Sequence, residues 1–450
     1  MAAATLWASA APAHAHGIGG RADLPLPLWL VAYAAAGVLV ATFVGLARLW
    51  PEPRFGGGTD GAAIPGLDGG FLGAAAVIGR LAGLCFFMLV WAAAAFGENA
   101  ADSNLAPRAV YVVFWVGLIA VSGLVGDVWR VLSPYDTMAA VGQRLRPGRS
   151  SAGGSHAGRD YRFGQWPAAV GLAAFTWLEL AHPNAASPRV LAVAIAVYSV
   201  AVLAGAAWWG RSWLRQGEAF AAFFALLAAA APFHRDDEGR LRIRPPLVGL
   251  ARLEVLPGTV ALIAVALGST SFDGLSRTSF WADIAGNRTG WAASALATVG
   301  LAWMVALVAV LYVGAMRLAA RVVSVEPMAL LNVFAHSLVP IALAYAVAHY
   351  FSLLVFEVQG AYALASDPFG WGWDLFGTAS RPINYRAVSP GTIAYVQAGA
   401  IVAGHVAGVV MAHDRAVATV PPRTAIRSQY PLLAAMVIYT VGGLVLLLGG

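Results

Sequence analysis

Long apolar runs constrain this chain more than any other feature of its sequence. Runs of roughly 18–25 apolar residues recur along its whole length, and as a helix each could cross a hydrocarbon layer of about 30 Å. Charged residues make up only 11% of the chain, whereas soluble domains carry about 25%. The polar residues are too few to cover a globular surface, so lipid must surround the protein. The sequence therefore predicts an all-α integral membrane protein.

The apolar runs predict about ten transmembrane helices in a single polytopic domain over residues 16–450. Their expected bounds are 27–49, 76–96, 109–128, 166–181, 190–209, 255–271, 291–316, 328–356, 391–412 and 429–448. The fourth and sixth are short and the eighth is long, which predicts helices of different tilt.

The arginines predict how the helices are oriented. The chain has 28 basic residues and a net charge of +6, and it contains no lysine. If the N-terminus lies outside, 21 arginines fall on the inner side and seven on the outer side. Because basic residues stay in the cytoplasm, we predict an N-out/C-out protein. Its Ala-, Gly- and Arg-rich composition favours a bacterial cytoplasmic (inner) membrane. Topology explains the positive charge, so we expect no nucleic-acid partner.

Three connecting segments are long. The cytoplasmic loops are predicted at 129–165 and 210–254, and each contains a mixed apolar stretch that is typical of a helix lying in the membrane plane. The extracytoplasmic loop 359–390 combines Trp, Phe and Tyr with Gly, Pro and Asp. We interpret it as a lid or interfacial loop on the outer face, and an aromatic belt without a lid role is the alternative.

The first residues raise the question of a cleaved signal. Residues 1–15 end in Ala13-His14-Ala15, which fits a signal-peptidase site, so they are a candidate signal-peptide remnant. Cleavage there would make His16 the N-terminal residue, whose amine and imidazole could chelate copper. The segment lacks a basic start and a full apolar core, so a flexible lead-in to the first helix is the alternative.

Two predicted spans carry histidines within the membrane. Asn332 and His336 lie four residues apart in the eighth span, and His405 lies at a similar depth in the ninth. Intramembrane ionisable groups usually face a cavity or a partner. We expect His336 and His405 to meet as a proton or metal relay. In the alternative, each imidazole bonds a backbone carbonyl and only packs helices together.

A second polar layer is expected where several helices end on the outer side. It contains His349 of the eighth span, Asp273 and Arg277 of the sixth, and Glu179 and His182 of the fourth. Imidazoles and carboxylates can hold zinc, whose bound water is a nucleophile near neutral pH. We predict His16, His182, His349 and Asp273 as metal ligands, with His349, Asp273 and Glu179 as ligands or bases and Arg277 stabilising developing charge. Alternatively, Asp273 and Arg277 form a surface ion pair.

Several motifs resemble a family of bacterial multi-span membrane proteins labelled fenitrothion hydrolase. They are "HGIGGRADLPLPLWL", "GDVWRVLSP", "GSTSFDGLSRTSFW", "AHSLVPIALAYAVAHYFSLL", "ALASDPFGWGWDLFGT" and "GHVAGVVMAHDRA", and the similarity runs from His16 to the last span. The resemblance implies hydrolysis of an aryl organophosphate triester by a membrane enzyme. It transfers no catalytic residue to this chain.

Three functions follow as expectations. The first is a membrane-embedded hydrolase, metal-assisted at the outer layer, with a small hydrophobic substrate. The second is a transporter or a proton- or metal-conducting permease that uses the intramembrane histidines. The third is a non-catalytic partner of a second membrane subunit.

Overall fold

The computed structural model describes residues 27–56, 61–64, 69–144, 161–236 and 238–448. This part of the chain is almost entirely helical, and nine of its helical segments are long and apolar enough to cross a membrane. They are α1 (Leu28–Leu49), α2 (Gly69–Phe96), the composite Leu105–Leu124, α8 (Pro188–Trp209), α10 (Thr259–Ser276), α12 (Gly290–Val323), α14 (Leu338–Leu364), α15 (Pro390–Thr419) and the composite Pro422–Leu447. The prediction of an all-α polytopic membrane protein is confirmed.

The predicted fourth span is a helix, but a short one. It forms α7 (Trp166–Leu180), whose 15 residues reach only about 22 Å at the usual rise per residue. This helix packs against α10 and against the short α9 (Ala219–Ala228). It therefore lies among the other helices without spanning the full thickness alone.

The two composite segments depart from a regular α-helix. Residues Leu105–Leu124 comprise α3 (Leu105–Arg108), the π-helix η1 (Ala109–Val116) and α4 (Gly117–Leu124). Pro422–Leu447 combines α16 (Pro422–Ser428) with most of α17 (Tyr430–Leu448).

The expectation of one continuous helix over 328–356 is wrong. The segment is divided into α13 (Pro327–Ala335) and α14, with His336 and Ser337 between them. Pro340 follows at the third position of α14 and has no N–H to donate to the carbonyl of His336, which favours a helix start here.

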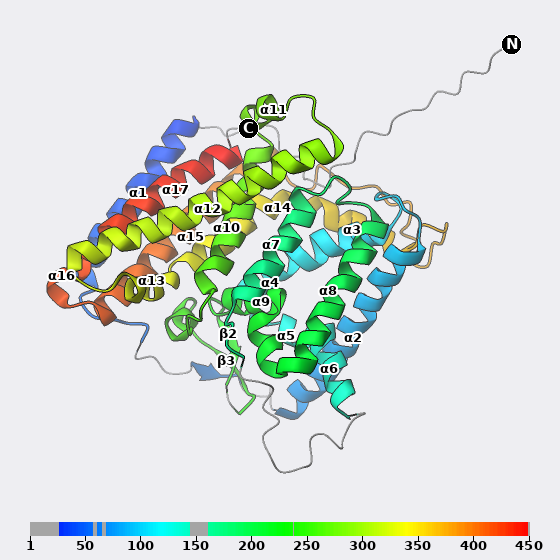
Figure 1. The fold of residues 1–450 in the computed structure, drawn as a ribbon, viewed down its shortest axis with the longest axis horizontal. Coiled ribbons are helices and arrows are strands. Elements are labelled where there is room, and N and C mark those ends of the chain that lie inside the picture. Colours follow the sequence, from blue (N-terminus) through cyan, green and yellow to red (C-terminus); the bar gives the residue numbers. More distant parts are fainter. Residues whose placement is uncertain (1–26, 57–60, 65–68, 145–160, 237, 449–450) are drawn as a thin grey trace.

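The remaining short elements gather mostly at one end of the bundle. They are α5 (Trp129–Leu132), α6 (Pro134–Arg144), the π-helix η3 (Trp213–Gly217), the 3-10 helix η4 (Val248–Arg252), and a three-stranded antiparallel sheet in the order β1 (Ala62–Ala63), β3 (Leu241–Ile243), β2 (Phe233–Arg235). We call this the sheet end. The opposite end carries α11 (Ser279–Ala285) and is called the α11 end (Figure 1).

The apolar stretch in loop 210–254 is predicted from the sequence to form a helix in the membrane plane. It forms α9, and this prediction is wrong because α9 is surrounded by protein. Eight of its ten residues are buried, and it contacts α4, α5, α7 and α14. Its sequence, "AFAAFFALLA", is apolar on every side, and such a helix is stable when it is surrounded by protein. Glu218 caps its first turn by accepting hydrogen bonds from the backbone N–H groups of Phe220 and Ala221.

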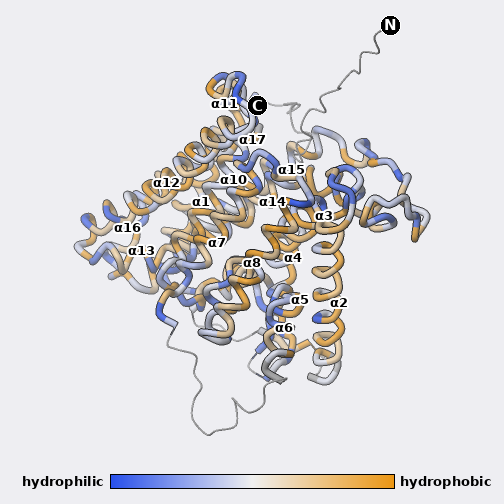
Figure 2. The backbone as a smooth tube through the Cα atoms, turned by 45° about the vertical axis from the view of Figure 1, so that its right-hand side comes forward, coloured by the Kyte–Doolittle hydropathy of each residue, from blue (hydrophilic) through white to orange (hydrophobic). Residues whose placement is uncertain are grey.

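The centre of the molecule is formed by α10 and α14. Of the most apolar 18-residue window of each helix, 83% is buried in α10 and 67% in α14, against 6% in α2. Figure 1 shows the two helices between a group that contains α1, α12 and α17 and a group that contains α2, α7 and α8. Figure 2 shows hydrophobic residues along the peripheral helices and hydrophilic ones mainly in the connections. Polar groups on α10 and α14 are thus held away from lipid.

Candidate functional site

The two central helices bring together three of the predicted site residues. His349 of α14 and Asp273 of α10 form a buried pair, with 2.7 Å between Nε2 and Oδ2. Arg277, one turn along α10 toward the α11 end, places Nη2 at 3.2 Å from both carboxylate oxygens. The side chain of Asp273 is 1% exposed and that of Arg277 is 28% exposed. The ion pair between Asp273 and Arg277 considered above is therefore present, but its carboxylate is buried rather than at the surface.

The Asp273 carboxylate orients the imidazole of His349. A carboxylate accepts hydrogen bonds, so in the neutral imidazole Nε2 carries the proton and Nδ1 has a free lone pair. Nδ1 is buried and has no hydrogen-bond partner among the described residues. The rings of Tyr345 and Tyr350 lie beside the imidazole, with centroids at 6.3 and 4.8 Å. Nδ1 is therefore a proton acceptor held in the protein interior.

Glu179 joins this cluster from the last turn of α7. Its side chain is buried, and within the part of the chain that the structure describes Oε2 has no hydrogen-bond partner. Glu179 interacts electrostatically with Asp273 and Arg277, consistent with the packing of α7 against α10. The cluster thus contains two carboxylates, one guanidinium and one imidazole.

His405 of α15 belongs to a second branch of buried polar groups. Its Nδ1 lies 2.8 Å from the carbonyl of Ile401, and its Nε2 has no partner in the described chain. The ring centroid lies 6.1 Å from that of Tyr439 in α17. Tyr439 hydrogen-bonds Ser271 of α10 at 2.7 Å, and its ring lies 5.9 Å from that of Tyr345. A series of hydroxyl and imidazole groups therefore extends from His349 to His405.

The expected hydrogen-bonded meeting of His336 and His405 does not occur. Both ring nitrogens of His336 face backbone carbonyls, those of Val333 at 3.0 Å and Leu253 at 2.9 Å. Asn332 is exposed and does not join a buried site. His336 lies in the break between α13 and α14, where unpaired backbone groups are available, and this matches the packing alternative.

Of the four predicted metal ligands, the structure brings His349 and Asp273 together. His182 accepts a hydrogen bond from the backbone of Asn184 and lies between the rings of Trp177 and Trp291. His16 lies outside the described residues. Among those residues, no group of three or more His, Cys, Asp or Glu side chains is arranged to hold a metal. The zinc or copper site stays a prediction.

A fully paired carboxylate at the sheet end provides a contrast. The Asp414 side chain is completely buried, and its Oδ1 accepts from the indole of Trp50 and the backbone N–H groups of Arg54 and Phe55. Its Oδ2 accepts from Arg415 at 2.6 Å. These bonds attach the segment that follows α1 to helix α15. Asp414 is a structural acid, whereas Glu179 keeps an unpaired oxygen.

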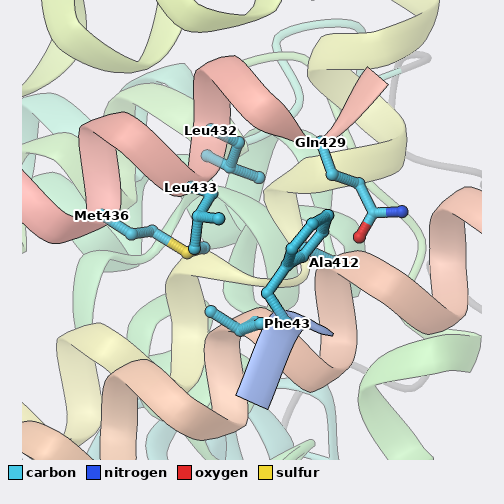
Figure 3. Close-up of a pocket in the computed structure, with 7 residues that line it drawn as sticks. Phe43, Ala412, Gln429, Leu432, Leu433 and Met436 are labelled. Atoms are coloured by element: carbon cyan, nitrogen blue, oxygen red, sulfur yellow. The ribbon is translucent and has the colours of Figure 1, made fainter. Parts of the chain in front are cut away.

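A small pocket lies near Asp414. It is lined by Phe43, Val409, Ala412, Gln429, Leu432, Leu433 and Met436. Its free volume of about 10 Å³ is on the order of one water molecule. Figure 3 shows Phe43 of α1 facing the side chains at the start of α17. The amide oxygen of Gln429 accepts a hydrogen bond from Nδ1 of His413 at 3.2 Å, and its amide nitrogen donates to the carbonyl of Ala425 at 2.9 Å.

Sequence reasoning missed the tyrosines of the site. Tyr345 precedes His349 by four residues and therefore shares its helix face, a spacing that could have identified it. Tyr439 lies in the last apolar span, and nothing local in the sequence indicates that it reaches Ser271. The side chain of Trp115, which is 2% exposed, comes from the π-helix η1, which packs against α14. π-Helices are frequent at functional sites, but the sequence carries no clear signal for this one.

Comparison with protein-family models found no match, and no curated protein or solved structure is significantly similar to the chain.

Proposed function

We propose that the protein is a membrane permease that moves protons, alone or coupled to a small solute, through a proton-binding centre formed by Asp273 and His349. The observation that carries this proposal is the buried imidazole fixed by a carboxylate at 2.7 Å, whose other nitrogen has no hydrogen-bond partner among the described residues. Ionisable groups are costly inside a membrane and are usually functional there. Transfer of a proton to Nδ1 creates an imidazolium beside a carboxylate, so the charge is compensated where it forms.

The polar series toward His405 supports a path rather than an isolated site. Hydroxyl groups donate and accept, so Tyr345, Tyr439 and Ser271 can pass a proton on after small rotations or through water. The unpaired Nε2 of His405 is the next acceptor. At the other end, Arg277 is partly exposed and connects Asp273 to the α11 end. Protons would enter or leave the centre there.

Proton flux into liposomes tests this proposal. The purified protein is reconstituted around a pH-sensitive dye, and a potassium gradient with valinomycin drives charge movement. We expect flux with the unchanged protein and its loss with His349→Gln. His182→Gln is the matched control, because the His182 imidazole lies between the rings of Trp177 and Trp291 and accepts from the backbone N–H of Asn184. Equal flux with His349→Gln and with the unchanged protein would reject the proposal, provided both elute as folded protein.

Hydrolysis of an aryl phosphotriester is the second candidate, favoured by the same Asp–His pair and by the resemblance of the motifs. In this reaction His349 would take a proton from water as the water oxygen attacks phosphorus, and the phenolate would leave. Arg277 would stabilise the developing negative charge. Asp273 and His349 are at most 5% exposed, so the helices must open for substrate. Release of nitrophenol from a nitrophenyl triester that depends on His349, without proton flux, would favour this function.

A further inference from the structure

The segment that follows α14 presents a rigid apolar surface. Large side chains are exposed over six residues: Trp371 by 53%, Trp373 by 41%, Leu375 by 60% and Phe376 by 70%. Phe369 stacks on Trp371 with 4.4 Å between ring centroids, and Trp373 meets Trp371 edge-on at 5.1 Å. Exposure of this much apolar area in so short a segment is unfavourable in water.

Hydrogen bonds fix the shape of this surface. The carboxylate of Asp367 accepts from the backbone N–H groups of Trp371 at 3.0 Å and Gly372 at 2.7 Å. The hydroxyl of Ser366 accepts from Phe376 N–H and donates to Asp374, both at 2.8 Å. Polar backbone groups are therefore satisfied inward while the apolar side chains point away from the turn.

Glycines allow the chain to make these turns. Gly370 and Gly372 have φ angles of +72° and +84°, in the left-handed region. A Cβ on Gly370 would also lie 2.9 Å from the carbonyl oxygen of Ser103 and 3.0 Å from the carboxylate of Glu98. The "FGWGW" spacing thus alternates aromatic side chains with residues that bend the backbone.

The surface adjoins a lipid-facing helix. The carbonyl of Phe369 accepts from the backbone N–H of Glu98 at 2.8 Å, two residues after the end of α2. The most apolar window of α2 is only 6% buried, and its last residue, Phe96, is 63% exposed. Figure 1 shows the chain after α14 extending beside the ends of α2 and α3. The apolar surface therefore continues the face that α2 turns to lipid.

We infer that Trp371, Trp373, Leu375 and Phe376 insert into the interfacial layer of the adjoining leaflet and anchor the α11 end to lipid. Indole rings favour this layer because their apolar body and their N–H group meet different surroundings there. Leu375 and Phe376 reach the acyl-chain boundary. The bound partner is the lipid bilayer itself, and the contact requires no proton transfer or hydrolysis by the protein.

Site-specific fluorescence quenching tests this inference. In a Cys85→Ala background, Phe376→Cys is labelled with the environment-sensitive dye NBD and reconstituted in phosphatidylcholine liposomes. Leu375→Cys is a second labelled position, and Ser380→Cys is the matched control, an exposed polar residue on the same segment. Lipids that carry a doxyl quencher near the headgroup or deep in the acyl chain report the depth.

We expect blue-shifted emission at 376 and 375, with stronger quenching by the shallow doxyl lipid than by the deep one and weak quenching by aqueous iodide. Position 380 should show strong quenching by aqueous iodide and weak quenching by both doxyl lipids. Strong iodide quenching at 376 and 375 without doxyl quenching would overturn the inference, because the surface would then face water. Protection from both quenchers would overturn it in favour of a protein partner.

Discussion

At the scale of single residues, hydrogen-bond completeness separates structural from functional polar groups. Asp414 is buried and both of its oxygens are occupied, whereas Glu179, His349 and His405 each keep an unpaired buried atom in the described chain. An unpaired polar atom in a protein interior costs stability. Three of these atoms lie on α7, α14 and α15, which supply residues to the candidate site, and we expect the protein to use them.

Removal of the Asp273 carboxylate should destabilise the folded protein, because His349 and Arg277 both lose the group that they bind. We expect Asp273→Ala to lower the free energy of unfolding by about 3 kcal/mol, because it leaves His349 without its partner in the interior. Asp273→Asn, which keeps the shape and one acceptor, should cost about 1–2 kcal/mol. Denaturant unfolding in detergent measures both. Equal stability of Asp273→Ala and the unchanged protein would show that the pair is not a strong contact.

The exposed turn after α14 should loosen in acid. Hydrogen bonds from the backbone N–H of Ala379 and from the hydroxyl of Ser366 lower the pKa of Asp374. Its folded pKa lies below the unfolded value of about 3.9, so the stabilisation is present above about pH 4 and is lost as the pH falls through the folded pKa.

Amide hydrogen exchange over residues 366–379, corrected for intrinsic rates, measures this loosening. Asp374→Asn should be loose at neutral pH already and should lose the acid-dependent step. Asp283→Asn, an exposed acid in α11, is the control and should behave as the unchanged protein. If Asp374→Asn shows the same increase in exchange at low pH as the unchanged protein, another group is responsible for the effect.

At the scale of helices, the sequence predicted the apolar spans well and their internal irregularities poorly. Nine of the ten expected positions contain candidate spans, because a period-free apolar run of sufficient length has few alternatives to a transmembrane helix. The break at His336 and the burial of α9 depend on what packs around them, as does the π-helix η1. In the local sequence, Pro340 only partly signals the break at His336, and the all-apolar "AFAAFFALLA" only partly signals the burial of α9.

Close packing of α14 on α15 should depend on one glycine. A Cβ on Gly404 would lie 2.1 Å from the Cβ of Ala344 and 2.9 Å from the carbonyl oxygen of Pro340. Gly404→Ala should therefore push the helices apart and cost about 1–3 kcal/mol. Gly399→Ala, on the same helix with nothing within 4 Å, should be neutral or stabilising by up to about 1 kcal/mol. Thermal unfolding in detergent compares them, and equal losses would contradict the close approach.

At the scale of the whole molecule, composition and length predicted the class of protein, and the central packing of α10 and α14 required the structure. The candidates Asp273, Arg277, His349 and Glu179 could be chosen from the sequence because charged residues stand out in apolar runs. The surrounding hydroxyl groups could not, since Tyr439 reaches Ser271 of α10 from a helix distant in sequence. His336 and His182 were chosen on the same grounds, and their contacts lie elsewhere.

The predicted N-out/C-out orientation places the α11 end outside the cell. In the Cys85→Ala background, Ser380→Cys at the α11 end and Thr419→Cys at the last residue of α15 are both exposed positions. A membrane-impermeant maleimide should label position 380 in intact cells and position 419 only after permeabilisation. The opposite pattern would invert the arginine-based orientation.

The most direct test of the account is whether His349 exchanges a proton inside the folded membrane protein. Solid-state ¹⁵N NMR of protein labelled at its nine histidines, reconstituted in lipid, distinguishes neutral imidazole from imidazolium. His349→Gln assigns the signal. We predict that His349 gives both the neutral and the imidazolium signal as the pH is varied, because the proposed centre takes up and releases a proton. A His349 signal that stays in one protonation state at every pH at which the protein remains folded would contradict the proposed proton-binding centre.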